Sequence, residues 1–173
     1  MFKSTIVALA AVSIDGKIGL HKNHFSDWTS KEDLDFLHQV LDDSDVVVVG
    51  HNTYKTAKKP LSQRNCIVLT RKIVDQKILN SRCLFYNPQE NSIKKLFERL
   101  KYKKIAVLGG TQVYTYFLER NLLDEFYITI EPVVFGRGLS LFESKKALMK
   151  KFKLKNIRKL NRKGSLLLRY KKI

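Results

Sequence analysis

Short apolar runs alternate with segments of helical spacing along most of this chain, and that alternation limits its folds more than any other feature. Six runs are continuous enough to be buried strands, at residues 6–12, 45–50, 65–70, 83–86, 104–108 and 125–131. Three segments between them place apolar residues three and four positions apart, at residues 30–41, 92–100 and 111–119. Strands without a polar face need cover on both sides, so the pattern predicts an α/β fold with a central, mostly parallel sheet flanked by helices.

The last part of the chain has a different pattern. Residues 152–160 and 165–170 are separated by the turn-like sequence Asn161-Arg162-Lys163-Gly164, which predicts an antiparallel hairpin. We therefore expect a mixed sheet with this C-terminal hairpin at one edge. No internal repeat, low-complexity tract or linker rich in proline, glycine and serine interrupts the sequence, so a single domain is expected over residues 1–173.

Composition narrows the class of protein. The 173 residues are 44% hydrophobic and 28% charged, which is typical of a globular domain. No apolar run approaches the ~20 residues of a membrane-spanning helix. The run at 6–12 behind Lys3 is either a short signal peptide or the first strand, and one preceding positive charge favours the strand. Cys66 and Cys83 are too few for a disulfide scaffold or a four-cysteine zinc site, so we expect a reduced, cytoplasmic protein.

The charge of the chain points to anionic partners. The sequence has 33 basic and 16 acidic residues, a formal net charge of +17, and no acidic residue from position 144 onward. Such a field favours nucleic acid, phosphorylated cofactors or acidic membranes, although lysines also form plain solvated surfaces. The basic segment contains only Phe152 and Tyr170 as aromatic residues, so it lacks the interleaved aromatics that favour nucleic-acid binding.

An acidic residue on an apolar helix face is the first candidate for chemistry. Ser30 can cap the helix at 30–41, with Asp33 three positions later. Asp33 also shares the predicted inward stripe, which consists of Leu34, Leu37, Val40 and Leu41. Burying an acid is costly unless it is paired or used. Two interpretations remain open: Asp33 works in a site, or it only stabilises the first helical turn through the helix dipole.

Three strand ends carry groups suited to a phosphate. Gly109 and Gly110 end one strand, and the helix at 111–119 begins at once. Glycine lets the backbone approach a ligand closely, and N–H groups at a helix start attract phosphate, but a plain tight turn has the same sequence. Hydroxyl and basic groups follow two further strands, at 51–54 and 70–72. Because ligands of open parallel sheets bind at the carboxyl ends of the strands, a phosphate site here is a reasonable hypothesis.

Together these segments resemble the dihydrofolate reductase family in order and spacing along nearly the whole chain. The family's first strand and flexible loop are similar to residues 9–19, which lead to Trp28, and its acidic residue five positions later matches Asp33. Other family blocks match Gly50-His-Asn-Thr53, Pro60-Leu-Ser-Gln-Arg64, Leu69-Thr-Arg71, Gly109 to Tyr114 and Tyr127-Ile-Thr-Ile130. The resemblance implies that family's single-domain fold.

The resemblance also implies a reaction, the reduction of 7,8-dihydrofolate to tetrahydrofolate. Asp33 would hold the pterin ring and promote protonation of N5 while hydride passes to C6, with Thr129 orienting Asp33 and Trp28 holding ordered water. Arg64 would bind the carboxylate of the folate tail. The implied substrate site consists of Leu9, Ala10, Leu34, Leu37, Arg64 and Leu108.

NADPH is the implied cofactor. Its nicotinamide would contact Ala11 and Ile18. Its pyrophosphate would bind where Gly109 and Gly110 lead into the helix at 111–119 (the glycine junction), and its 2′-phosphate would bind beside His51 and Arg71. The implied cofactor residues are Ala11, Ile18, Gly19, His51, Asn52, Thr53, Leu69, Thr70, Arg71, Gly109, Gly110, Thr111, Gln112, Val113 and Tyr114. His51 departs from the family, which commonly has arginine or lysine there, and a neutral imidazole weakens a phosphate site. The loop at 15–28 is also slightly longer than usual for the family.

A second family shares this fold: the riboflavin-pathway reductase, similar to the C-terminal part of RibD, which reduces the ribose of an aminouracil phosphate. Residues 12–17, 123–125, 134–138 and 141–142 resemble that group at least as much, although its reaction does not need an acid at Asp33. The zinc-deaminase motif that precedes such reductases is absent from the sequence. We predict folate reduction first and 5-amino-6-(5-phosphoribosylamino)uracil reduction as the alternative. A basic nucleic-acid-binding domain is the interpretation outside enzymes. The expected partner is a small-molecule substrate, and a homodimer is compatible with the sequence.

Overall fold

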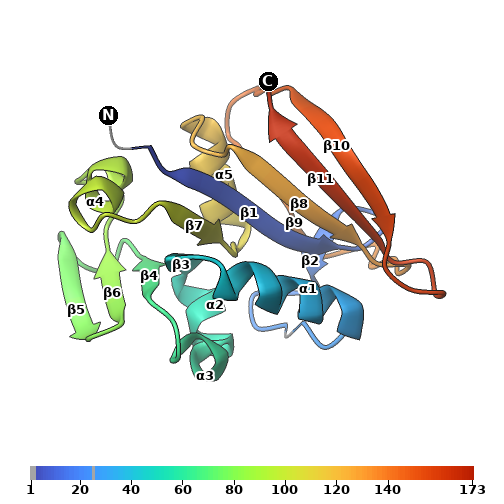
Figure 1. Cartoon of the computed structure of the whole chain (residues 1–173), viewed down its shortest axis with the longest axis horizontal. Helices are drawn as coiled ribbons and strands as arrows, with labels where there is room; N and C mark the ends of the chain where they lie inside the picture. The colour runs from blue at the N-terminus through green and yellow to red at the C-terminus, as the bar shows by residue number, and fades with distance from the viewer. Residues whose placement is uncertain (1–2, 25) are drawn as a thin grey trace.

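The computed structural model describes residues 3–24 and 26–173. Its strands are β1 (Thr5–Val12), β2 (Lys17–Gly19), β3 (Val46–Gly50), β4 (Cys66–Leu69), β5 (Gln76–Asn80), β6 (Cys83–Tyr86), β7 (Lys104–Val107), β8 (Glu125–Ile130), β9 (Leu139–Ser140), β10 (Phe152–Lys159) and β11 (Leu166–Lys172). Its helices are α1 (Lys31–Asp42), α2 (His51–Thr56), α3 (Lys58–Leu61), α4 (Ile93–Arg99) and α5 (Thr111–Glu119). Figure 1 shows their arrangement.

The main sheet has the strand order β10-β11-β8-β1-β7-β3-β4-β6-β5. Its centre is parallel, because β1 pairs with β7 and β8, β3 with β4 and β7, and β4 with β6 in that sense. The antiparallel pairs lie toward the edges, where β5 joins β6 and the β10–β11 hairpin joins β8. The predicted α/β class, the mostly parallel centre and the C-terminal hairpin are confirmed.

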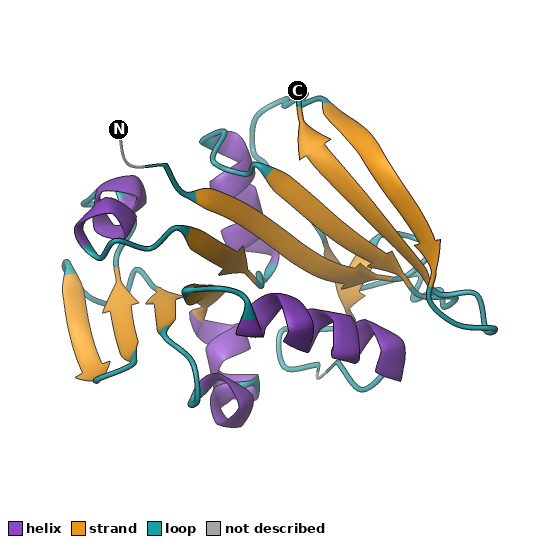
Figure 2. Ribbon diagram, viewed as in Figure 1, coloured by secondary structure: helices purple, strands orange, loops and turns teal. Residues whose placement is uncertain are grey.

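Helices cover both faces of this sheet (Figure 2). One apolar cluster contains Phe97 of α4 and Phe117 of α5, and the other contains Leu41 of α1 and Tyr54 of α2. Successive side chains of β3 alternate between the two, with residues 46 and 48 in the first cluster and residues 47 and 49 in the second. A strand that is buried on both faces must be apolar at every position, which is why this run contains four consecutive valines.

The sequence pattern does not predict five short elements, which are β2, α2, α3, β5 and β9. The four-residue α3 includes Pro60, and β5 is exposed at each of its five positions. A segment shorter than two helical turns, or a strand without a buried face, carries no readable apolar period. Two of these elements, α2 and β2, nevertheless adjoin the site described below.

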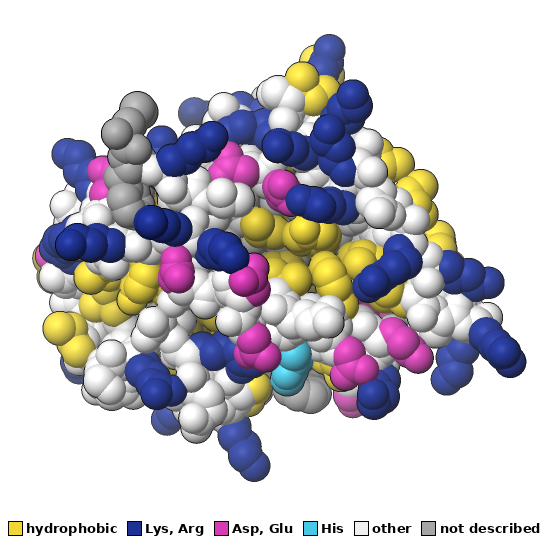
Figure 3. Space-filling model, viewed as in Figure 1, with side chains coloured by type: hydrophobic (Ala, Val, Ile, Leu, Met, Phe, Trp, Pro, Cys, Tyr) yellow, Lys and Arg dark blue, Asp and Glu magenta, His cyan; other side chains and the backbone are white. Residues whose placement is uncertain are grey.

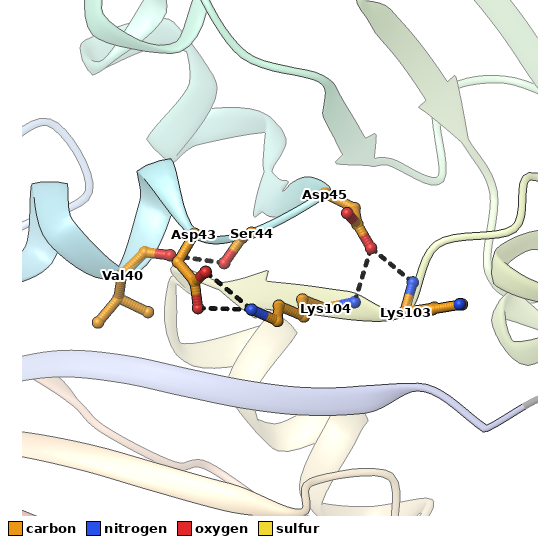
Figure 4. Close-up of polar contacts among 6 residues, drawn as sticks. All are labelled: Val40, Asp43, Ser44, Asp45, Lys103 and Lys104. Atoms are coloured by element: carbon orange, nitrogen blue, oxygen red, sulfur yellow. Dashed lines mark hydrogen bonds and ion pairs between the residues drawn. The ribbon is translucent and has the colours of Figure 1, made fainter.

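Polar contacts join the C-terminal end of α1 to the sheet (Figure 4). The Lys104 ammonium lies 2.7 Å from the Asp43 carboxylate, and the Asp45 carboxylate accepts the backbone N–H groups of Lys103 and Lys104 at 2.7 and 2.9 Å. The ion pair is exposed, so its own contribution to stability is small. These contacts hold one end of α1 beside β7, while Asp33 lies at the other end of the helix.

The surface carries the excess of positive charge. Lysine and arginine side chains spread over the visible face, and apolar side chains gather in a hollow near its centre, over the sheet above α1 (Figure 3). Within the described ranges, none of the helices combines the length and the apolar character that crossing a bilayer requires.

Candidate active site

The carboxyl ends of β3 and β7 meet through one hydrogen bond. The N–H of Gly50 donates to the carbonyl of Gly109 at 2.7 Å, and α5 begins directly after Gly110. The Thr53 hydroxyl of α2 lies 3.7 Å from the point that a Cβ on Gly110 would occupy. The structure therefore brings a helix start, a glycine backbone and a hydroxyl group together, which is the arrangement that binds phosphate groups.

Gly109 must be glycine for steric reasons. Its φ is +83°, and a Cβ there would lie 2.3 Å from the Tyr114 ring. The Gly109–Gly110 peptide bond is cis. Tyr114 itself is buried, its pKa is raised by that burial, and its hydroxyl donates to the backbone carbonyl of Leu9. Three residues predicted for the cofactor thus have side chains in the apolar core, which are Leu69, Val113 and Tyr114.

Side chains from three elements gather on the outer side of this junction. Arg71, after β4, donates to the Gln112 side chain of α5 at 3.3 Å. The His51 ring packs edge-on against Phe85 at 5.9 Å, and its Nδ1 is buried without a hydrogen-bond partner in the described part of the chain. Burial and the nearby charges of Lys55 and Lys72 lower the pKa of His51. His51 is therefore neutral at pH 7 unless an anion approaches it.

Asp33 lies in the first turn of α1, where its side chain is buried. The Ser30 hydroxyl accepts the Asp33 N–H at 3.3 Å, which confirms the predicted helix cap. Burial raises the pKa of Asp33 to about 6, Thr129 of β8 lowers it, and Glu131 raises it further. The predicted pair of Asp33 and Thr129 is thus brought together, and the carboxyl of Asp33 can exchange a proton near neutral pH.

Two loops far apart in the sequence meet at the edge of the site. The Asp15 carboxylate accepts the N–H groups of Phe135 and Gly136 at 3.1 and 2.9 Å, and β2 pairs with β9 just beyond. The Thr111 hydroxyl, at the start of α5, donates to the Ser140 carbonyl at 2.6 Å. These contacts connect both loops to each other and to the start of α5 beside the glycine junction.

Trp28, predicted to be catalytic, and Arg64, predicted to bind substrate, both have partners within the chain. The Trp28 ring packs edge-on against Phe135, with 4.9 Å between ring centroids. The Arg64 guanidinium already has two partners within the chain. It lies 2.5 Å from the Asp42 carboxylate and donates to the Pro60 carbonyl at 3.0 Å. The other predicted substrate residues are buried or half-buried, and these are Leu9, Ala10, Leu34, Leu37 and Leu108.

The nicotinamide residues predicted from the resemblance lie on β1, on β2 and near them. Ala11 of β1 pairs in register with Thr129, and Ile18 of β2 lies 3.9 Å from the point of a Cβ on Gly110. Gly19 closes β2, Asn52 is exposed on α2, and Thr70 is buried after β4. Ala11 therefore lies beside Thr129, and Ile18 lies near the glycine junction.

Sequence reasoning missed Phe135, which packs on Trp28, and the buried pair formed by Glu131 and Ser165. Glu131 could have been found, because it lies two residues after Thr129 and side chains two apart along a strand face the same side. Ser165 could not, since no local pattern relates it to a residue 34 positions earlier.

Comparison with known proteins places this geometry in a family. The family model described as RibD C-terminal domain matches residues 4–164. The uncharacterized protein YwjB of Bacillus subtilis (strain 168) is 27% identical over 154 residues, which cover 82% of this chain and 84% of that protein.

Two solved structures show the same fold. A pyrimidine reductase-like protein from Corynebacterium diphtheriae has a TM-score of 0.77 and 20% identity, covering 98% of this chain and 92% of that chain. The diaminohydroxyphosphoribosylaminopyrimidine deaminase/5-amino-6-(5-phosphoribosylamino)uracil reductase of Thermotoga maritima has a TM-score of 0.75 and 20% identity, covering 99% and 57%.

The matched residues include Asp33, the glycine junction and both loops, so the site described above lies almost wholly within the match. The predicted cofactor, NADPH, agrees with this result. Of the two families that the sequence resembles, the family model is that of the riboflavin type, and the folate type is not confirmed. The chain belongs to the RibD C-terminal domain family.

Proposed function

We propose that this protein is an NADPH-dependent reductase of the riboflavin-pathway type, acting on 5-amino-6-(5-phosphoribosylamino)uracil or a closely similar pyrimidine ribose phosphate. The observation that carries the proposal is the family match over residues 4–164. The loops at 12–17 and 134–138 support it, because they resemble this group in sequence and Asp15 joins them at the edge of the site. The proposal reverses the order of the two substrates predicted from the sequence.

The residues present fit NADPH. Its pyrophosphate suits the backbone of Gly110 and the start of α5, with the Thr53 hydroxyl beside them. Its 2′-phosphate suits Arg71, which the Gln112 side chain holds in place. The bound cofactor supplies a hydride, and the protein has to hold the acceptor and manage the accompanying proton.

Asp33 is the group best suited to the proton. Hydride reduction of a pyrimidine ribose phosphate or of a dihydropterin consumes one proton along with the hydride. A buried carboxyl with a pKa of about 6 is protonated in an appreciable fraction of molecules at neutral pH, and it can also bind the N–H edge of a pyrimidine ring. Thr129, which is 2% exposed, fixes the orientation of that carboxyl.

Dihydrofolate is the second candidate substrate, and the pairing of Asp33 with Thr129 favours it. Protonation of the pterin N5 depends on an acid at this position, whereas ribose reduction needs a proton that a donor elsewhere in the site could also supply. The ion pair between Arg64 and Asp42 disfavours dihydrofolate as the substrate, because the carboxylate of a folate tail would have to displace Asp42.

The test is the loss of NADPH absorbance with each substrate, for wild type, Asp33→Asn and Arg64→Leu, together with separate measurement of NADPH binding by fluorescence. Turnover of the aminouracil phosphate that Arg64→Leu leaves unchanged is the expected result. Turnover of dihydrofolate alone, reduced about 100-fold or more in Asp33→Asn, would replace the first substrate by the second. Tight NADPH binding without turnover of either compound would refute both proposed substrates and leave only the assignment of NADPH as cofactor.

A further inference from the structure

Glu131 is a buried carboxyl that the proposed reaction does not use. It directly follows β8 and is 3% exposed. Its Oε1 accepts hydrogen bonds from the backbone N–H and the hydroxyl of Ser30, at 2.8 and 2.7 Å, and its Oε2 accepts one from the Ser165 hydroxyl at 2.5 Å. All three donors are uncharged, so a charged partner does not explain why an acid is kept at this place.

The neighbouring hydrogen bonds show why Glu131 acts as the acceptor here. The Ser30 hydroxyl already accepts the N–H of Asp33 at 3.3 Å, and the Ser165 hydroxyl accepts the side-chain N–H of Asn161 at 2.9 Å. Each hydroxyl already accepts from a nitrogen donor, and its own proton is directed to Glu131. Glu131 therefore accepts three hydrogen bonds, two through Oε1 and one through Oε2.

Glu131 connects three segments at the acidic end of α1. Through Ser30 it holds the helix cap, through Ser165 it holds the start of β11, and its own backbone directly follows β8. Asn161 of the hairpin turn extends the connection to Glu32, because its side-chain N–H donates to the Glu32 carboxylate at 3.1 Å. The first turn of α1, which carries Asp33, is therefore positioned by a residue about 100 positions away in sequence.

We propose that Glu131 is a positioning residue of the site, which clamps the first turn of α1 through Ser30 and holds its own carboxyl group next to that of Asp33. The role of Asp33 in the reaction rests on the proposed function, but the clamp and the proximity of the two acids exist without substrate. Repulsion between the two groups acts in the same direction as the burial of Asp33 and raises the pKa of Asp33.

The other groups next to Asp33 do not supply this effect. Glu32 belongs to the same helical turn, but it is exposed and its carboxylate is turned to Asn161. Tyr114 of α5 keeps its hydroxyl proton and donates it to the Leu9 carbonyl. The threonines at 29 and 129 act in the opposite sense, since hydrogen bonds to the carboxylate stabilise its charge.

The experiment uses the ligand-free protein with ¹³C-labelled aspartate and follows the Asp33 carboxyl by NMR as a function of pH, with Asp33→Asn to assign its signal. Glu131→Gln keeps the size of the side chain and its ability to accept from Ser30 but removes the charge. We expect the Asp33 midpoint to fall on the order of one pH unit in this variant. Ser165→Ala is the matched control, because it removes a hydrogen bond and keeps the charge, and there the midpoint is expected not to fall.

An unchanged Asp33 midpoint in a folded Glu131→Gln variant would overturn the proposal. If that variant fails to fold, the wild type still decides: labelling with ¹³C-glutamate must show Glu131 ionised throughout the pH range in which Asp33 titrates, and a protonated Glu131 in that range refutes the proposal. Inactivity of the wild type toward both substrates would instead refute the proposed function and leave these titrations unaffected.

Discussion

Single side chains in this protein show how a site is made at the expense of stability. Asp33 is a buried acid, and His51 is a half-buried imidazole near Lys55 and Lys72. Removal from water disfavours the charged form of each group, which raises the pKa of Asp33 and lowers the pKa of His51. Such groups give two predictions at the scale of the residue.

Asp33→Asn is expected to stabilise the protein at high pH. The pKa of Asp33 rises from 3.8 to about 6 on folding, so the folded protein binds the proton more tightly than the unfolded chain. Stability therefore falls as the pH rises from about 4 to about 6, and the loss remains above that range. At ~1.4 kcal/mol per pKa unit, the variant gains up to about 3 kcal/mol at pH 8.

Urea unfolding of wild type and Asp33→Asn at pH 8 and at pH 4 measures this difference. The advantage of the variant should disappear at the lower pH, where the unfolded chain also takes up the proton. A variant that is less stable than wild type at both pH values would show that lost hydrogen bonds with Thr129 outweigh the buried charge.

His51 is expected to make NADPH binding weaken with rising pH. Its pKa is lowered in the free protein, so pairing with a 2′-phosphate requires uptake of a proton, which becomes costlier as the pH rises. His51→Arg, which carries a permanent charge, should bind NADPH about tenfold more tightly at pH 8 and with a flatter pH dependence. Calorimetry with NADPH measures both quantities, and NADH is the control because it lacks this phosphate. Equal affinity of the two proteins for NADPH at pH 8 would separate His51 from the phosphate.

At the scale of elements, the site depends on junctions more than on helices or strands. The helix starts and loops around it are tied to each other by backbone contacts, such as Gly50 to Gly109 and Asp15 to Phe135. Short elements that lack an apolar period, α2 and β2 among them, are positioned by these contacts and not by their own propensity. At the junction between β7 and α5 the packing is tight, because the Tyr114 ring lies directly against the backbone of Gly109.

Gly109→Ala is expected to destabilise the protein by about 3 kcal/mol or more, because the new Cβ adds both strain at positive φ and overlap with the Tyr114 ring. Gly136→Ala is the matched control. Its φ is +67°, but nothing lies within 4 Å of the new Cβ, so only the strain of about 1 kcal/mol remains. Thermal or urea unfolding compares the two variants. Equal losses would mean that Tyr114 moves aside without cost.

At the scale of the whole molecule, the net charge of +17 surrounds the site with a positive field. We expect the association rate of NADPH to fall several-fold between low and physiological salt, because the field that attracts the anion is screened over about 8 to 10 Å. The rate for NADH, with fewer negative charges, should fall less. Stopped-flow fluorescence measures both rates, and identical salt dependence would show that the excess lysines are only a solvated surface.

Much of the fold follows from local pattern. The predicted strands and the helices at 30–41, 92–100 and 111–119 agree with the structure to within a few residues, because a sheet buried on both faces leaves continuous apolar runs. The cap at Ser30 and the glycines before α5 also follow from short-range chemistry, since each serves the turn in which it stands.

What the sequence by itself determined was therefore the class of fold, its apolar core, the cap of α1 and the acid in its first turn. The tertiary structure alone decided that Glu131 and Ser165 hold that turn, that Arg64 forms an ion pair with Asp42, and that the His51 ring packs against Phe85. The physical reason is distance along the chain. Periodicity and capping act over a few residues, whereas hydrogen bonds and burial depend on which distant segments the sheet order brings together.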